Sequence, residues 1–432
     1  MLAVVYDPVE VLPREELERL QLARLQEMVA SLYLSSPFYR DKWSQVGFEP
    51  DDLRSLEDIR KLPLVTKEEL REEQRLHPPF GRLTIAGRNT WRELHPSSGT
   101  TGTQVLTVWT EKDVENITNF TTRFLWGIGV RAGDVVHNAF SYGLWIAGMA
   151  VHYATKKLGA FVIPIGGLPV EHHVRLLRQV HPTAIFATPS FGLYLAETLK
   201  RQGLGPEDVG LRCGAFGGEA GVEVGGTRRR LEEGLGIRAY DIYGLSEIAP
   251  TMACECEAQA GLHWAEDFFL VEILDPITHE PVPDGEPGLL VITHLDREGT
   301  PMIRYATNDI TTFTRSLCPC GRTHGRSPGG IKGRLDDLIV FRGAKFYPTE
   351  IEDVVRSLPG CTGEYYVEVR GEREHPAEVT VVAEADEMQV SAEHLRQRLR
   401  ETLLVAPYVR LVPPGTLERT AFKAKRVVRM PE

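Results

Sequence analysis

The sequence has few cysteines, no long apolar run and no excess of basic residues. Six cysteines in 432 residues are too few for a disulfide scaffold. No apolar run approaches the length of a membrane span, and the chain turns polar and acidic too soon after residues 1–5 for a signal peptide, so we expect a cytoplasmic protein. The formal net charge of −11 is unlike that of a general nucleic-acid binder. We therefore expect neither nucleic acid nor a membrane as a partner.

The rest of the composition is that of an ordinary globular chain, with 42% hydrophobic and 25% charged residues. Its length allows two or three domains. Residues 14–35 have the spacing of a surface helix. From residue 134 to residue 244, short apolar runs alternate with helical segments, which predicts βαβ units and a largely parallel sheet. The expected strands are 160–163, 184–187 and 239–242, and the expected helices are 172–180 and 191–201.

The pattern changes again after residue 268. Extended runs at 269–274, 288–294 and 310–313, the first two separated by turn residues, predict a β-rich subdomain. A smaller α+β unit follows. It has expected helices at 348–357 and 391–404 and expected strands at 365–369 and 378–382. We predict an α/β fold with two domains, residues 1–335 and 336–432.

The most informative segment is Ser97-Ser98-Gly99-Thr100-Thr101-Gly102-Thr103. Its glycines let the backbone approach a ligand, and its hydroxyls and amides offer donors to phosphate oxygens. It lacks the lysine of a Walker loop. Taken alone, it is equally well explained as a solvated turn.

Three more segments carry suitable chemistry, although each has an ordinary explanation when taken alone. Tyr243-Gly244-Leu245-Ser246-Glu247 combines a ring that can stack on a base with a carboxylate that can hold magnesium, yet it also fits a strand-to-loop transition. Tyr305-Ala306-Thr307-Asn308-Asp309 ends in a carboxylate suited to ribose hydroxyls, yet it is also a common turn. Gly333-Arg334-Leu335-Asp336-Asp337, followed by Arg342-Gly343-Ala344-Lys345-Phe346, could be polar linker.

The order and spacing of these segments resemble the adenylate-forming superfamily, most closely its phenylacetate–CoA ligase branch. The resemblance runs through nearly the whole chain and implies a large AMP-binding domain with a small mobile C-terminal lid. Other matching segments are Ser36-Pro37-Phe38-Tyr39-Arg40, Gly261-Leu262-His263, residues 301–305, Cys318-Pro319-Cys320-Gly321-Arg322 and Glu418-Arg419-Thr420-Ala421-Phe422-Lys423.

The resemblance implies the roles of individual residues. Residues 97–103 would wrap the ATP phosphates, Tyr243 would stack on adenine, and Asp309 would hold the ribose. Glu247 would hold Mg²⁺, and Lys423 would bridge the attacking carboxylate and the α-phosphate. Lys425 fits that role less well by its spacing. Further nucleotide contacts are implied for Gly218, Glu219, Ala220, Asp241, Gly244 and Arg334; Asp336 matches the hinge, and Gly343 and Lys345 the face toward CoA.

The sequence departs from the family pattern at four places, and none of them removes a group that the chemistry needs. Thr103 replaces a common lysine, and Gly218-Glu219-Ala220 lacks a proline that the branch often has. Phe422 replaces a common glycine, and Asn308 replaces a more common residue before the ribose aspartate.

Cysteine and histidine form a set of soft ligands in two pieces of sequence. Cys256, His263, Cys318 and Cys320 would close a tetrahedral zinc site, and the branch includes members with structural zinc. Cys254 is an alternative ligand. The other explanation is scattered buried thiols with an ordinary polar histidine.

The resemblance places the acid substrate against Phe140, Tyr142, Gly143 and Trp145, where aromatic walls suit a flat ring but suit a core as well. We expect an AMP-forming ligase of aromatic acid catabolism that uses ATP, Mg²⁺ and CoA, acts on a small aryl or arylacetic acid and forms a homodimer. The alternatives are transfer to a carrier-protein thiol, release of the adenylate as product, and a nucleotide-binding protein without catalysis. A phosphotransferase is disfavoured because the Walker lysine is missing.

Overall fold

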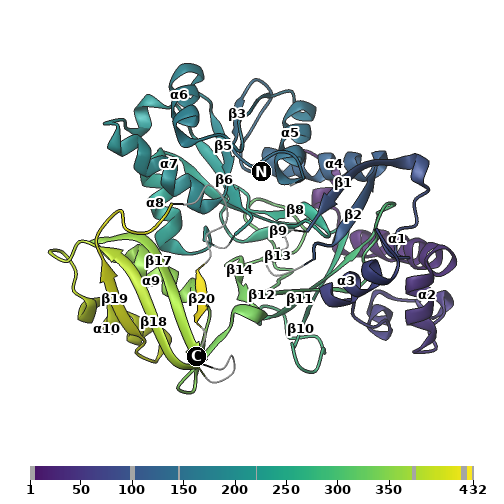
Figure 1. Cartoon of the computed structure of the whole chain (residues 1–432). Helices are drawn as coiled ribbons and strands as arrows, with labels where there is room; N and C mark the ends of the chain where they lie inside the picture. Colours follow the sequence, from purple (N-terminus) through teal and green to yellow (C-terminus); the bar gives the residue numbers. More distant parts are fainter. Residues whose placement is uncertain are drawn as a thin grey trace. The chain divides into compact units, whose positions relative to one another are not determined.

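The computed structural model describes residues 5–97, 103–144, 146–219, 221–371, 376–419 and 426–430 (Figure 1). The chain forms two compact units. The first comprises residues 1–167 and 242–328, and the second comprises residues 168–241 and 329–432. The predicted boundary between residues 335 and 336 stays a prediction.

The first unit begins with a helical segment. Ser36 separates its first two α-helices and caps the second one, its hydroxyl accepting a hydrogen bond from the Tyr39 amide, while Pro37 occupies the tolerated first turn. Leu17, Leu25 and Leu32 bury one face of the first. The elements up to β1 are η1 (Pro8–Val11), α1 (Arg14–Ser35), α2 (Pro37–Ser44), η2 (Pro50–Asp52), η3 (Leu56–Lys61), α3 (Lys67–Leu76) and η4 (Arg88–Thr90).

The strands of the first unit form several pairings. A hairpin joins β1 to β2, β3 and β4 are parallel, and β10, β11 and β12 are successive antiparallel neighbours. The end of β7 pairs with β8, followed by β9 and β13, all antiparallel. The elements are β1 (Trp91–Pro96), β2 (Leu106–Thr110), α4 (Glu111–Gly127), β3 (Val135–Asn138), α5 (Ile146–Leu158), β4 (Phe161–Pro164), residues 242–245 of β7 (Arg238–Leu245), β8 (Ala249–Cys254), β9 (Leu262–Trp264), β10 (Phe269–Leu274), β11 (Gly288–His294), β12 (Tyr305–Thr311) and β13 (Arg326–Ser327).

The second unit combines a parallel βα segment with a four-stranded sheet. Strands β5 and β6 are parallel, and the sheet has the order β19-β18-β17-β20, with α9 and α10 packed on it around an apolar core (Figure 1). The elements are α6 (Val170–Val180), β5 (Ala184–Ala187), α7 (Pro189–Arg201), η5 (Pro206–Asp208), β6 (Cys213–Gly217), α8 (Gly225–Leu235), β14 (Ile331–Arg334), η6 (Leu335–Asp337), β15 (Ile339–Phe341), β16 (Ala344–Phe346), α9 (Pro348–Ser357), β17 (Cys361–Gly371), β18 (Pro376–Ala385), α10 (Ala392–Leu403), β19 (Tyr408–Val412) and β20 (Val427–Met430).

In the second unit, an arginine of α8 donates hydrogen bonds to the end of α9, and an arginine of α9 donates one to α8. The Arg230 guanidinium donates to the carbonyls of Arg356 at 2.7 Å and Cys361 at 2.8 Å, and also to that of Thr362. These carbonyls lie at and just beyond the C-terminal end of α9, where a cation also suits the helix dipole. In return, Arg356 donates to the Thr227 hydroxyl at 2.6 Å.

The mixed α/β fold is confirmed, and several elements have the predicted bounds, among them the helix at 14–35 and the strands at 184–187, 269–274 and 288–294. The strand expected at 310–313 is wrong. Strand β12 begins at Tyr305 and ends at Thr311, so it contains the residues that taken alone resemble a turn. The turn-like residues reflect an irregularity of pairing opposite Leu289 and Val291, where Asn308 has a φ of +66°.

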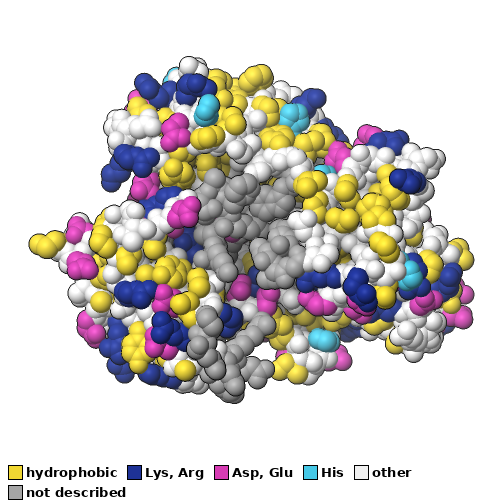
Figure 2. Space-filling model, in the orientation of Figure 1, with side chains coloured by type: hydrophobic (Ala, Val, Ile, Leu, Met, Phe, Trp, Pro, Cys, Tyr) yellow, Lys and Arg dark blue, Asp and Glu magenta, His cyan; other side chains and the backbone are white. Residues whose placement is uncertain are grey.

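The surface carries charges of both signs. Figure 2 shows Lys and Arg side chains interspersed with Asp, Glu and apolar side chains over the described part of the face that it presents. Among the described residues, we find no helix with both the length and the apolar character needed to cross a bilayer.

Candidate active site

Ser97, directly after β1, is the first residue of the hydroxyl-rich loop that connects β1 to β2. The Ser97 amide donates to the Val105 carbonyl at 2.7 Å, and the Val105 amide donates to the Ser97 hydroxyl at 3.0 Å. Ser97 is fully buried and Thr103 is exposed. The other predicted phosphate-binding residues, 98–102, lie outside the described residues. The ends of this loop are therefore fixed by a reciprocal pair of hydrogen bonds.

The structure brings together two predicted residues that are far apart in the sequence. The Tyr243 hydroxyl donates to the Asp309 carboxylate at 2.6 Å, joining the end of β7 to β12. The Tyr243 ring also meets the Trp264 ring edge-on, with centroids 5.6 Å apart. At Gly244 a Cβ atom would lie 2.0 Å from the Pro250 carbonyl oxygen, so only glycine fits this turn.

Asp309 owes its position to the irregularity in β12. Asn308 adopts the left-handed conformation, which asparagine tolerates better than most residues. The Asp309 amide then donates to the Thr307 hydroxyl at 3.1 Å. The carboxylate is buried, with 4% of the residue exposed, yet it reaches the phenol of Tyr243.

Glu247 is a buried carboxylate with a cationic partner. Its side chain is 6% exposed and pairs with the Lys67 ammonium at 2.6 Å. Sequence reasoning missed Lys67. One signal was available, because Lys67 is the first residue of α3, where a positive charge opposes the helix dipole.

The predicted acyl segment follows β3 in the first unit. Phe140 is buried, and the Tyr142 hydroxyl accepts a hydrogen bond from the Asn138 amide at 2.8 Å. Burial raises the pKa of Tyr142 to about 12, so its hydroxyl stays protonated near neutral pH. Gly143 has a φ of +95°, and Trp145 lies outside the described residues. A ring nitrogen of His95 holds the Leu144 carbonyl at 3.0 Å.

The remaining predicted residues belong to the second unit. A carboxylate oxygen of Glu219 accepts a hydrogen bond from the Ser190 amide at 2.7 Å, and Gly218 has a φ of +87°. Arg334 and Asp336 form an exposed ion pair at 3.1 Å, a contact that contributes little to stability. Asp241 is buried, Lys345 is exposed, Gly343 has a φ of +85°, and Ala220 and Lys423 lie outside the described residues.

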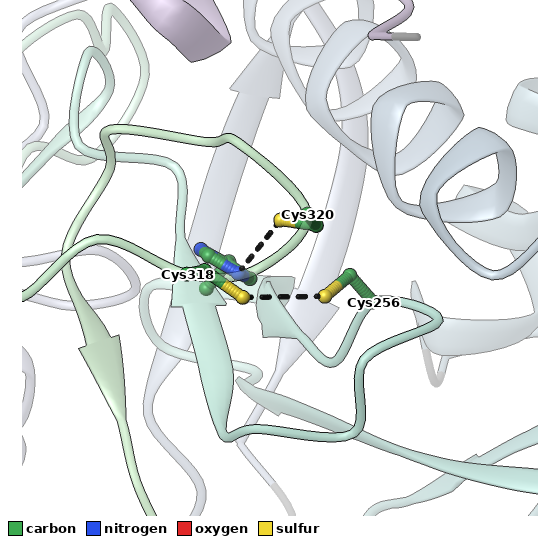
Figure 3. A group of neighbouring side chains, drawn as sticks. Cys256, Cys318 and Cys320 are labelled. Carbon is green, nitrogen blue, oxygen red and sulfur yellow. Dashed lines mark hydrogen bonds between the residues drawn. The ribbon is translucent and has the colours of Figure 1, made fainter. Parts of the chain in front are cut away.

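The four predicted soft ligands converge in the first unit. The ligand atoms of Cys256, His263, Cys318 and Cys320 all lie within 4.8 Å of one another. The sulfurs of Cys256 and Cys318 are 3.8 Å apart, and His263 Nε2 is 3.5 Å from the Cys320 sulfur. Figure 3 shows the side chains of Cys318 and Cys320, from one loop, and that of Cys256, from another, pointing toward one another. Cys254 is not part of this group among the described residues.

The electrostatics of this group favour a thiolate. A hydrogen bond from Cys256 and the nearby His263 lower the pKa of Cys320 well below its usual value, against the effect of burial. Burial lowers the pKa of His263, but hydrogen bonds with Cys318 and Cys320 outweigh it and raise the value to about 9. His263 Nδ1 lies 3.2 Å from the His324 carbonyl, to which it donates. The Nε2 atom therefore faces the sulfurs, as in a metal-ligating histidine.

The loop with Cys318 and Cys320 also contacts η1 and the residue that follows it, which the sequence did not reveal. Arg322 pairs with Glu10 of η1 at 2.6 Å. The Thr323 amide donates to the Glu10 carbonyl at 3.0 Å, and its hydroxyl donates to the Leu12 carbonyl at 2.6 Å. A ring nitrogen of His324 contacts the Val9 carbonyl at 3.1 Å.

Comparison with known proteins places these features in a family. Residues 66–295 match the family model described as AMP-binding enzyme, and residues 343–430 match that of the AMP-binding enzyme C-terminal domain. The chain therefore belongs to the AMP-binding, adenylate-forming enzymes. Its place within that class is the phenylacetate–CoA ligase family of AMP-forming acid–thiol ligases.

The relatives cover almost the whole chain. It is 37% identical to the phenylacetate-coenzyme A ligase of Thermus thermophilus over 98% of this chain and 99% of that protein. The Escherichia coli enzyme of the same name is also 37% identical, over 98% and 96%. A 2-hydroxyisobutyryl-CoA ligase in its postadenylation state has a TM-score of 0.93 at 33% identity, covering 98% of this chain and 91% of that one.

Proposed function

We propose that this enzyme activates a small aryl or arylacetic acid, phenylacetate-like, with ATP. The acid carboxylate attacks the α-phosphorus, pyrophosphate leaves, and an acyl-adenylate forms. The thiol of CoA then attacks the acyl carbon, the thioester forms, and AMP leaves. The observation that carries the site assignment is the hydrogen bond from Tyr243 to Asp309, because it joins the motifs proposed to hold adenine and ribose.

Each proposed role follows from charge and position. Asp309 would accept hydrogen bonds from the ribose hydroxyls, and Tyr243 would present its ring to adenine. A divalent cation held at Glu247 would offset the repulsion between the anionic acid and the triphosphate. Lys423 would stabilise charge on the α-phosphate as the attack proceeds. Asp336 would act as the hinge about which the small domain rotates. That rotation would withdraw Lys423 and bring the face with Gly343 and Lys345 toward CoA.

The aromatic character of the acid is supported by the acyl segment. Phe140 is apolar and would supply one wall, and the hydroxyl of Tyr142, which accepts a hydrogen bond from the Asn138 side chain, stays neutral. Such side chains would suit a flat ring without a second charge. The relatives named phenylacetate-coenzyme A ligase agree with this choice.

The test measures pyrophosphate and AMP release across a panel of carboxylic acids, with and without CoA. We expect release with aryl acids and thioester only with CoA. Lys423→Ala should slow adenylate formation by about 10²–10³-fold, as removal of a charge-stabilising group does. Glu247→Gln, which loses the proposed cation ligand, should also slow adenylate formation. Glu401→Gln, on the exposed face of α10, is its control and should behave as wild type.

Three outcomes would change the proposal. Thioester formation on a carrier-protein thiol but not on CoA would change the acceptor. Adenylate that accumulates whether or not CoA is present would mean that the adenylate is the product. No release with any acid, with Lys423→Ala equal to wild type, would leave a nucleotide-binding protein without catalysis.

We also propose that Cys256, His263, Cys318 and Cys320 hold a structural zinc ion. A tetrahedral ion with sulfur bonds of ~2.3 Å separates two sulfurs by ~3.8 Å. Cys256 and Cys318 have that separation. Four protein ligands close the coordination sphere, so the ion would fix loops rather than activate a substrate.

Size-exclusion chromatography with light scattering would test the expected homodimer, and the cytoplasmic location stays a prediction.

A further inference from the structure

We propose that Lys67 neutralises Glu247 in the nucleotide-free enzyme and competes with the divalent cation for that carboxylate. The inference rests on the proposed function, in which Glu247 holds the cation of Mg-ATP. Lys67 is then a positioning residue for the first half-reaction, and it sets how much Mg²⁺ the enzyme needs.

The first support is the contact itself. The Lys67 ammonium lies 2.6 Å from a carboxylate oxygen of Glu247. The Glu247 side chain is 6% exposed, and that of Lys67 is 23% exposed. Within the described ranges, Lys67 is the only cation that forms an ion pair with Glu247. A carboxylate this deeply buried needs a compensating charge, and Lys67 supplies it before any ligand binds.

The second support is that Lys67 starts from a fixed backbone. Val65 pairs with β12, its amide donating to the Arg304 carbonyl at 2.9 Å and its carbonyl accepting from the Ala306 amide at 2.9 Å. Thr66 then caps α3, accepting from the Glu69 amide at 3.2 Å. The first turn of α3 is therefore anchored to the strand that carries Asp309.

The third support is the helix face to which Lys67 belongs. Lys67, Arg71 and Gln74 are spaced i, i+4, i+7 and so share one face of α3. Arg71 donates to the Thr103 carbonyl at 3.0 Å, and Gln74 exchanges hydrogen bonds with the Leu106 backbone at 2.7 and 2.9 Å. One face of α3 thus contacts both the end of the proposed phosphate loop and the proposed cation ligand.

The consequence is a competition. A divalent cation that binds Glu247 must displace the ammonium or share the carboxylate with it. Removing the charge at position 67 leaves Glu247 without its partner. The cation then no longer has to break the ion pair, and it binds more tightly. Lys67→Met should therefore lower the Mg²⁺ concentration that half-saturates ATP binding.

The test is calorimetric titration of ATP into the full-length protein over a series of MgCl₂ concentrations. We expect Lys67→Met and Lys67→Gln to lower the half-saturating Mg²⁺ concentration by about 5- to 10-fold, the effect of losing one partly buried ion pair. Lys67→Arg keeps the charge and should stay within about twofold of wild type. Lys112→Met removes a lysine–carboxylate pair with Asp296 elsewhere in the same unit and should leave the Mg²⁺ requirement unchanged.

Other results would overturn the proposal. An unchanged Mg²⁺ requirement in both uncharged variants would make the pair a purely structural contact. Weaker ATP binding at saturating Mg²⁺ would make Lys67 a phosphate ligand instead. If wild type binds ATP without regard to Mg²⁺, or if Glu247→Gln leaves the Mg²⁺ series unchanged, the assignment of Glu247 itself fails, and this inference falls with it.

Discussion

Asn308 shows how the backbone of one residue determines the position of a neighbouring side chain. Its φ of +66° allows β12 to deviate from regular pairing just before Asp309. A β-branched residue is strained in this conformation, whereas glycine adopts it freely. The position therefore tests whether the irregularity holds Asp309 against Tyr243.

We expect Asn308→Val to lower the free energy of unfolding by about 1–3 kcal/mol, the cost of a strained backbone conformation. It should also weaken ATP binding, because Asp309 would turn away from Tyr243. Asn308→Gly should keep the binding. Urea unfolding and calorimetry on the two variants provide the check, and equal ATP affinity in Asn308→Val and wild type would contradict it.

His294 is a second residue whose surroundings determine its chemistry. Its Nδ1 accepts from the Met302 amide at 3.0 Å, and its Nε2 donates to the Ile248 carbonyl at 3.1 Å, so it must be neutral. Burial, with a smaller contribution from Arg297, lowers its pKa to about 3. Between this pKa and the unfolded value of about 6.5, the unfolded chain binds the extra proton.

We therefore expect His294 to make the protein less stable as the pH falls below about 6.5. The loss is about 1.4 kcal/mol per pH unit from this group alone. Urea unfolding of wild type and His294→Gln at pH 7, 6 and 5 provides the measurement. The variant should start less stable and lose less on acidification, and parallel curves would disprove the assignment.

At the scale of elements, the cysteine-bearing loop couples the proposed metal site to η1. Residues 318–324 bind Glu10 and Leu12 through Arg322 and Thr323. Removing the metal takes away the bonds that would join this loop to Cys256 and His263, so the loop should loosen. The segment it holds should then become more exposed to solvent.

We expect chelation, or Cys320→Ser, to accelerate hydrogen–deuterium exchange in residues 8–14 while the sheet around β17 and β18 is unaffected. Cys361→Ala removes a buried thiol of the second unit and serves as the control. Unchanged exchange in residues 8–14 of a protein shown to have lost its metal would show that the metal does not hold η1 in place. Metal affinity should fall as the pH is lowered, because protons then compete with the metal for the ligands.

The elements also show where sequence reasoning succeeds and fails. Helix α1 was predictable from its many helix-favouring residues, Leu, Glu, Arg and Gln, and α9 from Pro348 at its first turn, because both signals are local. Strand β12 was predicted badly, because Asn308 resembles a turn residue. The resemblance assigned Tyr243 and Asp309 to one nucleotide site, although their hydrogen bond was not predicted. Nothing in the sequence indicated the Lys67–Glu247 pair, since it joins residues 180 positions apart with no shared motif.

For the whole molecule, the compact units do not follow the order of the chain. Residues 168–241 belong with 329–432. Within that unit, Arg230 satisfies carbonyls at the end of α9, and Arg419 pairs with Glu197 of α7 at 3.0 Å. A chain cut after residue 335 would leave Arg230 and the α8 face without these partners.

We therefore expect the fragment 1–335 to have a lower melting temperature than the full chain and to expose the α8 face. Differential scanning calorimetry and binding of a hydrophobic dye provide the measurements. Arg230→Lys in the full chain should show a smaller loss, because lysine lacks the planar group that serves several carbonyls. A fragment as stable as the full chain would show that residues 168–241 do not depend on these contacts.

Lys67 has a consequence for protein engineering. A procedure that optimises helix ends would replace it with glutamate, since an acidic first turn suits the dipole of α3. That change would place two carboxylates against each other beside the proposed phosphate loop, in the region where this enzyme is to gather an anionic acid and a triphosphate. A substitution chosen to stabilise the helix would therefore cost activity at this position, and Lys67 should not be replaced by an acidic residue in a redesign of the scaffold.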